Sequence, residues 1–274
     1  VPGTPPPADR VVHDEKDDTY YIELLRTNDD RFLCIYLEAT VSTEQRCAPA
    51  ANPAAFTALS PRERDHLYDA DHAGGRWVIR TNWNAPNYRL MTAPDGRPRS
   101  EWTDLVAHDP TVFIEDFEPF DSFVAIEERA GGNKRLRLLT NAGKSSLVEA
   151  DEPAYAMKLG DNRQSASATV RYTYDSLTTP QTIYEVDAQS GARTVLKRTP
   201  APGYDSSQYV TERVWAPARD GARIPVSLVY GKGFEREGTA AMLQYAYGAY
   251  GSSNDPEWET QIASFLDRGM VYAI

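Results

Sequence analysis

Cysteine is scarce in this sequence, and histidine is not clustered. The 274 residues include two cysteines, Cys34 and Cys47, in no CxxC pattern, and four histidines that nowhere show metal-ligand spacing. These absences argue against a structural zinc site and leave no metal or cofactor to expect. So few cysteines are typical of a reducing compartment. We therefore expect both thiols to stay reduced in a cytoplasmic protein, with a single disulfide between them as the alternative.

Long apolar runs and an excess of positive charge are also missing. No apolar run approaches the roughly 18 residues of a membrane span, and the formal net charge is −11 with a pI near 4.9. An acidic chain does not attract nucleic acid or an anionic membrane, so neither is expected as a partner. A basic ligand is compatible with this charge. The first ten residues lack the basic and apolar regions of a signal peptide, and we interpret them as a loop.

What is present is a repeat of short strands. β-rich runs begin at Phe32, Trp77, Phe123 and Val170, which are 45, 46 and 47 residues apart. Second short strands follow the last three runs, at 88–92, 136–140 and 182–187. A period in the forties made of short strands is typical of β-propeller blades. We predict a partial β-propeller over residues 1–200, with about four blades of a presumed seven; a β-sandwich with accidental spacing is the alternative.

The pattern changes after Pro200. Thr199–Gly203 is rich in proline and glycine and predicts a domain boundary. Strands are expected at 209–215, 224–230 and 241–245, with Asp220–Gly221 as a hairpin turn between the first two. The apolar residues at helical spacing are Trp258, Ile262, Phe265 and Leu266, and they predict a helix over 257–268. A further strand is expected at 270–274. Residues 201–274 therefore have the pattern of the beginning of an α/β domain.

Several stretches in this order carry a resemblance to the prolyl oligopeptidase family of serine peptidases. They are Glu15–Tyr21, Pro61–His66, Arg171–Pro180, Ala218–Gly221, Ile224–Tyr230, Tyr245–Gly251 and Leu266–Ile274. The resemblance covers essentially the whole chain and is strongest to the oligopeptidase B branch, whose members cut short peptides after Arg or Lys. It implies a propeller followed by the N-terminal portion of an α/β-hydrolase domain over residues 201–274.

The resemblance implies a catalytic role for Tyr247. In the family, the second tyrosine of the YxYG stretch turns its hydroxyl toward the scissile carbonyl oxygen. A donor at that position stabilises the oxyanion of the tetrahedral intermediate. This chain has Ala246 where the family usually has glycine. Without the resemblance, Tyr247 would be interpreted as an ordinary packed aromatic residue.

The resemblance also implies three substrate-binding residues. Asp255 and Glu257 match two acids that hold a basic side chain at the second subsite of oligopeptidase B, and Tyr250 matches a residue of the primary pocket in prolyl-specific members. Carboxylates bind a guanidinium through charge-assisted hydrogen bonds. The alternative for the acids is helix capping, with Asp255 as the N-cap and Glu257 in the first turn. For Tyr250 the alternative is loop packing.

No nucleophile is recognisable in these 274 residues. The serine pairs lack the GxSxG elbow, and the resemblance places the catalytic Ser, Asp and His beyond Ile274. We expect an internal piece of a serine oligopeptidase that acts on short basic peptides, inactive alone and paired with the remainder of its catalytic domain. The alternatives are a prolyl oligopeptidase proper and a non-enzymatic propeller module. His66 and His72, beside several aspartates, are interpreted as hydrogen-bonding residues and not as metal ligands.

Overall fold

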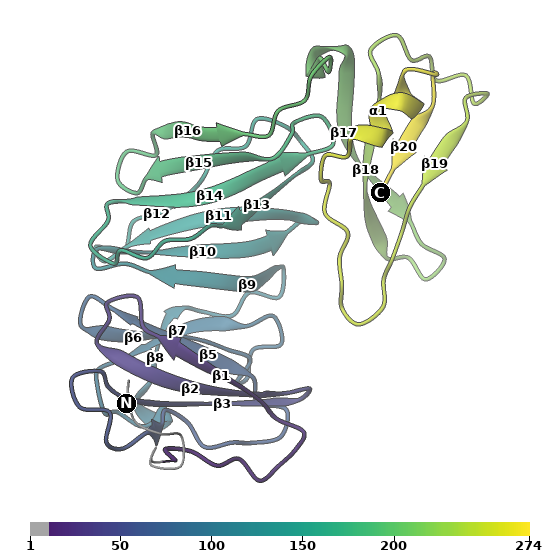
Figure 1. Cartoon of the computed structure of the whole chain (residues 1–274). Coiled ribbons are helices and arrows are strands. Elements are labelled where there is room, and N and C mark those ends of the chain that lie inside the picture. Colours follow the sequence, from purple (N-terminus) through teal and green to yellow (C-terminus); the bar gives the residue numbers. More distant parts are fainter. Residues whose placement is uncertain (1–10) are drawn as a thin grey trace. The chain divides into compact units, whose positions relative to one another are not determined.

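The computed structural model describes residues 11–274, and Figure 1 shows that strands dominate it. The interpretation of the first ten residues as a loop lies outside the described part. The chain divides into two compact units, which are described separately below. Unit 1 is built mainly from residues 1–110, and unit 2 contains 122–163 and 167–274 with 111–118.

Unit 1 contains two sheets of four antiparallel strands, each ordered as in the sequence. The first sheet is β1 (Tyr21–Arg26), β2 (Phe32–Ala39), β3 (Ser42–Pro49) and β4 (Thr57–Ala58). The second is β5 (Tyr68–Ala73), β6 (Arg76–Thr81), β7 (Arg89–Ala93) and β8 (Thr103–Val106), with a short 3₁₀ helix at Arg99–Glu101. A core of buried side chains that includes Tyr68, Trp77 and Trp102 joins residues from both sheets.

Unit 2 contains two more four-stranded repeats, which share one sheet. The first repeat is β9 (Val112–Pro119), β10 (Phe123–Ala130), β11 (Asn133–Thr140) and β12 (Ser145–Leu147). The second is β13 (Tyr155–Leu159), β14 (Thr169–Ser176), β15 (Thr182–Asp187) and β16 (Arg193–Arg198). A parallel pairing of Lys134 with Ala156 connects β11 to β13. Within the repeats, β11 pairs antiparallel with β10 and β12, and β13 to β16 pair antiparallel in sequence order.

The predicted repeat is confirmed. The four runs that begin at Phe32, Trp77, Phe123 and Val170 lie in β2, β6, β10 and β14, the second strand of each four-stranded sheet or repeat. The predicted partner strands correspond to β7, β11 and β15. Four-stranded sheets of consecutive strands that repeat along the chain are the blades from which β-propellers are built. The β-sandwich alternative is therefore wrong.

The expectation of two reduced cysteines is wrong, because Cys34 and Cys47 form a disulfide. They lie directly opposite each other on β2 and β3, with 4.1 Å between their Cα atoms. That register depends on the turn between the strands, which composition does not indicate. The argument for a reducing compartment loses its basis, and a cytoplasmic location stays a prediction. Within residues 11–274, no helix is long and apolar enough to span a membrane.

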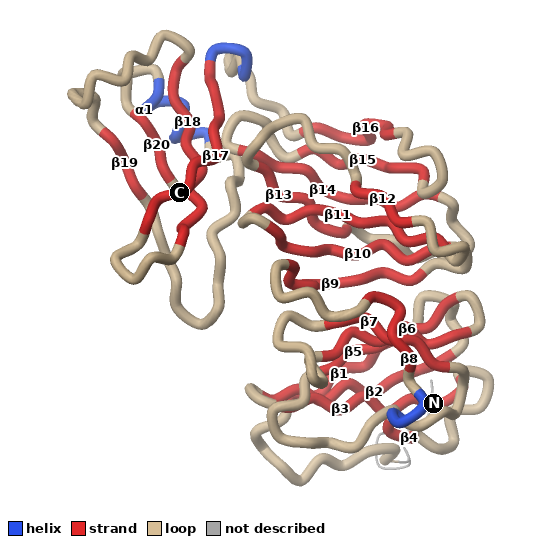
Figure 2. The backbone as a smooth tube through the Cα atoms, turned by 180° about the vertical axis from the view of Figure 1, so that it is seen from behind, coloured by secondary structure: helices blue, strands red, loops and turns tan. Residues whose placement is uncertain are grey.

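The last sheet has the order β17-β18-β20-β19. Its strands are β17 (Tyr209–Pro217), β18 (Arg223–Gly231), β19 (Met242–Gln244) and β20 (Val271–Ala273), with a 3₁₀ helix at Ser206–Gln208 before β17. β17 and β18 form the predicted hairpin around Gly221, whose φ of +89° suits glycine. β19 and β20 are parallel, and α1 (Thr260–Leu266) lies in the connection between them beside the sheet (Figure 2).

The helix is shorter than predicted, and the capping interpretation of Asp255 is wrong. α1 begins at Thr260, its N-cap is Glu259, and the Asp255 side chain bonds Arg129 instead of helix amides. The helix buries Ile262 and Leu266 in a small core with residues of β18 and β20. This apolar contact fixes the helix. The residues directly before Thr260 are not helical and belong to the loop of residues 245–259.

Candidate active site

The loop of residues 245–259, between β19 and α1, carries the four predicted site residues. Tyr247 is 48% exposed and lines a cavity of about 280 Å³. Asn254 lines the same cavity, and its side-chain amide donates to the carbonyl oxygen of Tyr247 at 3.1 Å. The remaining lining includes Arg129, Arg213, Tyr245, Ser252, Ser253 and Ile274. Tyr247 therefore borders a hollow large enough for a few peptide atoms.

Tyr250 differs from Tyr247. Its side chain is 97% exposed, its φ is +56°, and it is not part of the cavity lining. A left-handed conformation is uncommon for a bulky residue. The alternative, that the Tyr250 ring packs within its loop, is wrong, because a ring that is 97% exposed has almost no packing contact with residues 11–274. Contact of Tyr250 with substrate stays a prediction.

Asp255 and Glu257 lie close to cations from two propeller strands. Arg129, at the end of β10, donates from Nη1 to Asp255 Oδ1 at 2.8 Å. Lys158, on β13, bonds the Glu257 carboxylate, and its Nζ is 3.8 Å from Asp255 Oδ2. The Asp255 side chain is only 9% exposed, whereas that of Glu257 is 49% exposed. The two acids therefore share Lys158 but differ strongly in their access to solvent.

Arg129 is held on both sides by carboxylates. Its Nε donates to Glu115 at 2.6 Å, and its Nη1 also reaches the Gly132 carbonyl oxygen at 3.3 Å. Burial acts to lower the pKa of Arg129, but the bonds and charges of Asp255 and Glu115 outweigh burial and raise it. The guanidinium is thus fully charged, and its position is fixed.

Asp175 joins this region from β14. Its Oδ1 accepts a hydrogen bond from the Trp258 backbone N–H at 2.7 Å, one residue after Glu257. Burial, and to a smaller extent the charge of Glu257, raise the pKa of Asp175 to about 7, although the bond from Trp258 and the charge of Lys158 act in the opposite direction. This carboxyl group therefore changes charge near neutral pH while holding the loop that carries the two acids.

Arg213, on β17, is a further cation of the cavity lining. It donates to Ser227 Oγ and to the Gly131 carbonyl oxygen. A Cβ added at Gly132 would lie 2.1 Å from Arg213 Nη2 and 2.8 Å from Pro225 Cγ, and the φ of +82° at this position also requires glycine. Sequence reasoning missed Arg129, Lys158, Asp175 and Arg213. The one available signal was a pair of adjacent glycines, Gly131 and Gly132, directly after the charged end of β10.

The histidines singled out beside aspartates make hydrogen bonds inside the propeller. His66 contacts Thr81 Oγ1 at 3.0 Å and Arg99, and burial lowers its pKa. His72 is fully buried between Asp29 and Asp95, with ring nitrogens 2.6 and 2.9 Å from their carboxylates. The hydrogen-bonding interpretation is confirmed. Among residues 11–274, no three His, Cys, Asp or Glu side chains are grouped to hold a metal ion.

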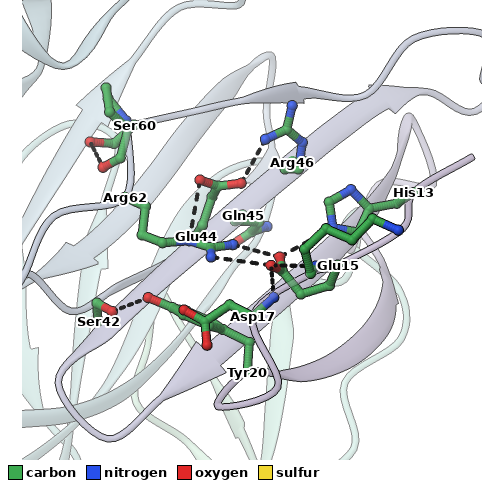
Figure 3. A network of polar contacts seen from close by, with 12 residues as sticks. His13, Glu15, Asp17, Tyr20, Ser42, Glu44, Gln45, Arg46, Ser60 and Arg62 are labelled. Carbon is green, nitrogen blue, oxygen red and sulfur yellow. Dashed lines mark hydrogen bonds and ion pairs between the residues drawn. The ribbon is translucent and has the colours of Figure 1, made fainter.

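Two stretches that carried the resemblance lie against each other in unit 1 (Figure 3). Arg62 Nη2 donates to Glu15 Oε2 at 2.7 Å, and its guanidinium lies 3.7 Å from the centre of the Tyr20 ring. The bond from Arg62 is the main cause that lowers the pKa of Glu15 to about 2. Glu44 on β3 is 3.7 Å from Arg62 Nε. These contacts fasten the segment before β1 to the first blade.

The chain has four propeller blades followed by a mixed sheet and a helix. Comparison with known proteins identifies the family to which it belongs. Residues 2–199 match the family described as "Prolyl oligopeptidase, N-terminal beta-propeller domain". The chain belongs to this family, known as peptidase family S9.

Individual relatives agree with this assignment. Dipeptidyl aminopeptidase BI of Pseudoxanthomonas mexicana is 53% identical over the whole chain, which spans 38% of that protein. Protease 2 of Moraxella lacunata is 28% identical over 98% of the chain and 39% of its own length. Oligopeptidase B from Leishmania major superposes with a TM-score of 0.90 at 29% identity, over 99% of this chain and 40% of that structure. The chain thus spans about two fifths of the length of these relatives.

Proposed function

We propose that this chain is part of a longer serine oligopeptidase that hydrolyses short peptides after Arg or Lys. The observation that supports this most is the loop of residues 245–259, which brings Tyr247 to a cavity and two acids to the end of a propeller strand. The homologues named oligopeptidase B add to this support. The nucleophile and its base would come from the remainder of the protein.

In this proposal, Tyr247 is the side-chain donor of the oxyanion hole. Its phenol would donate a hydrogen bond to the carbonyl oxygen of the scissile bond as that oxygen becomes negative. Such a donor stabilises the transition state more than the bound substrate, and its removal costs on the order of 3 kcal/mol. Asp255 and Glu257 would provide negative charge for a basic group of the peptide, and Tyr250 would contact the substrate from the exposed tip of the loop.

We also propose that residues 201–274 are the beginning of the α/β-hydrolase domain, with the boundary near Pro200. The parallel pair β19 and β20, connected through α1, is a β-α-β arrangement, which is the unit from which α/β domains are built. One such unit supports this assignment, and further units would come from the remainder of the protein. A non-enzymatic propeller module would have no need for Tyr247 at a cavity.

A second candidate activity is the release of dipeptides from a free N-terminus. It is favoured by the 53% identity to a protein named dipeptidyl aminopeptidase BI. In such a reaction the second residue from the cut carries the α-ammonium group, which an exposed carboxylate such as Glu257 could bind. The two candidates share the same chemistry and differ in the cation that the acids recognise. The two acids do not favour a prolyl oligopeptidase proper, because the side chain of proline carries no charge.

The test is a substrate panel for the full-length protein. We expect hydrolysis of fluorogenic peptides with Arg or Lys before the cut, loss of activity with a serine-directed phosphonate, and little hydrolysis after Pro. Blocking the N-terminus of the peptide separates the two candidates, because a dipeptidyl aminopeptidase requires it free. The 274-residue chain by itself should show no turnover. Preference for Pro, or resistance to the phosphonate, would refute the proposal.

A further inference from the structure

The two acids of the loop are not equivalent. Asp255 is almost completely buried and bonded to Arg129, whose position Glu115 and the Gly132 carbonyl oxygen also fix. Separating a buried ion pair leaves an uncompensated charge out of water, which is strongly unfavourable. A basic group of a ligand would therefore gain less from Asp255 than from Glu257, because the Asp255 carboxylate already has a fixed cationic partner.

Glu257 has a much looser partner. Half of its side chain is exposed, and the Lys158 side chain that bonds it is 41% exposed. Ion pairs between exposed side chains contribute only about 0–1 kcal/mol. A lysine ammonium sits on a flexible stem of four carbons, so it can leave one carboxylate without disturbing the strand that carries it. Glu257 is thus the acid that an incoming cation can reach.

Lys158 also has a second carboxylate within reach. Its Nζ lies 3.8 Å from Asp255 Oδ2, whereas Arg129 bonds the other oxygen, Oδ1. Movement away from Glu257 would therefore keep the ammonium beside a negative charge. This arrangement lowers the cost of freeing Glu257, and it leaves the cation near the site after displacement.

We propose that Lys158 is a specificity-determining residue, an internal cation that competes with the basic group of the substrate for Glu257. The inference rests on the proposed function, in which these acids bind a basic group of the peptide. Lys158 weakens the subsite for every cationic ligand, and only a group that binds Glu257 better than the lysine ammonium does is retained. A guanidinium, which can make two parallel bonds to a carboxylate, meets that condition best.

The experiment uses the full-length protein and a pair of peptides that carry arginine or citrulline at the second position from the cut. Citrulline has nearly the same shape as arginine but no charge. We expect Lys158→Met to lower KM for the arginine peptide by about three- to tenfold, with kcat unchanged and no effect on the citrulline peptide. Lys158→Arg places a guanidinium against Glu257 and should raise KM for the arginine peptide, because a competitor that makes two parallel bonds is harder to displace. If Lys158→Met disturbs folding, Lys158→Gln serves the same purpose.

A matched control is Lys144→Met, which removes a lysine of the same unit that donates to the Gln189 carbonyl oxygen. It should leave both peptides unaffected. An unchanged or reduced preference for arginine in both Lys158→Met and Lys158→Gln would overturn the inference, because a competing cation can only weaken binding of the charged peptide.

Glu257→Gln separates failure of the inference from failure of the proposed function. In the wild-type background it should reduce the preference for arginine over citrulline, and it should also abolish the effect of Lys158→Met. If Glu257→Gln reduces the preference but Lys158→Met does not increase it, only the inference is wrong. If Glu257→Gln has no effect on the preference, the acidic subsite is wrong and the inference fails with it.

Discussion

The carboxyl group of Asp175 couples β14 to the loop before α1 through its bond with the Trp258 N–H. Its pKa of about 7 lies above the value of 3.8 expected in the unfolded chain. The protonated form is therefore favoured by folding, and the stability that this gives is present at low pH and lost as the pH rises through 7. We predict that this carboxyl group lowers the free energy of unfolding of the wild type by about 1 kcal/mol between pH 5.5 and pH 8.5, after allowance for solvent screening. Asp175→Asn should remove this decrease.

Denaturant unfolding at the two pH values measures this difference. The exposed Asp161 provides a matched control, since Asp161→Asn should alter stability equally at both values. A wild-type protein and an Asp175→Asn variant with the same pH dependence would show that burial does not control this carboxyl group.

The partners of the predicted acids could not be derived from the sequence. Arg129 and Asp255 are 126 residues apart, and Lys158 and Glu257 are 99 residues apart. No local pattern connects positions at such separations. The resemblance could assign Asp255 and Glu257 to a subsite, but it could not indicate that one of them is buried against an arginine. The disulfide was missed for a similar reason, because it depends on the register of one hairpin.

Among the secondary-structure elements, the strands were predicted better than the helix. Each blade has the same order of turns and β-rich runs, so a regular spacing identifies all four second strands at once. The helix had one short apolar pattern, and Trp258, counted as its first apolar residue, instead lies edge-on to the Tyr204 ring before the helix begins. A tertiary contact thus replaced the first helical turn.

The segment before β1 is an element whose attachment can be tested. Arg62 bonds Glu15 and stacks on Tyr20, so we predict that Arg62→Met speeds hydrogen exchange of residues 15–20 by about three- to tenfold at pH 7. Because the pKa of Glu15 is lowered to about 2, the ion pair contributes above pH 4.5 and its contribution is lost as the pH falls toward 2. The difference from wild type should shrink over that interval.

Arg64→Met is the matched control, since Arg64 is exposed and pairs with the adjacent Asp65. It should leave exchange in residues 15–20 unchanged. Equal exchange in wild type and Arg62→Met would mean that the segment is held by its backbone contacts and not by the arginine.

For the whole molecule, the chain accounts for only part of the serine peptidase that we propose, and the nucleophile would come from the remainder of the protein. It has four propeller blades and a loop with a tyrosine at a cavity, and it spans about two fifths of the length of its relatives. The family could be predicted from the sequence because its motifs lie in the same order on both sides of Pro200. The choice between endopeptidase and dipeptidyl aminopeptidase could not, because both would use the same acids.

The most direct test of the central claim is to measure kcat/KM of full-length Tyr247→Phe and Glu257→Gln on peptides with arginine or citrulline at the second position. An oxyanion donor serves every substrate, so Tyr247→Phe should lower kcat for both peptides alike, by about 10²- to 10³-fold. Glu257→Gln should lower kcat/KM for the arginine peptide by about tenfold and leave the citrulline peptide nearly unchanged. Equal effects of Glu257→Gln on both peptides, or a negligible effect of Tyr247→Phe, would contradict the assignment of this loop as the active site.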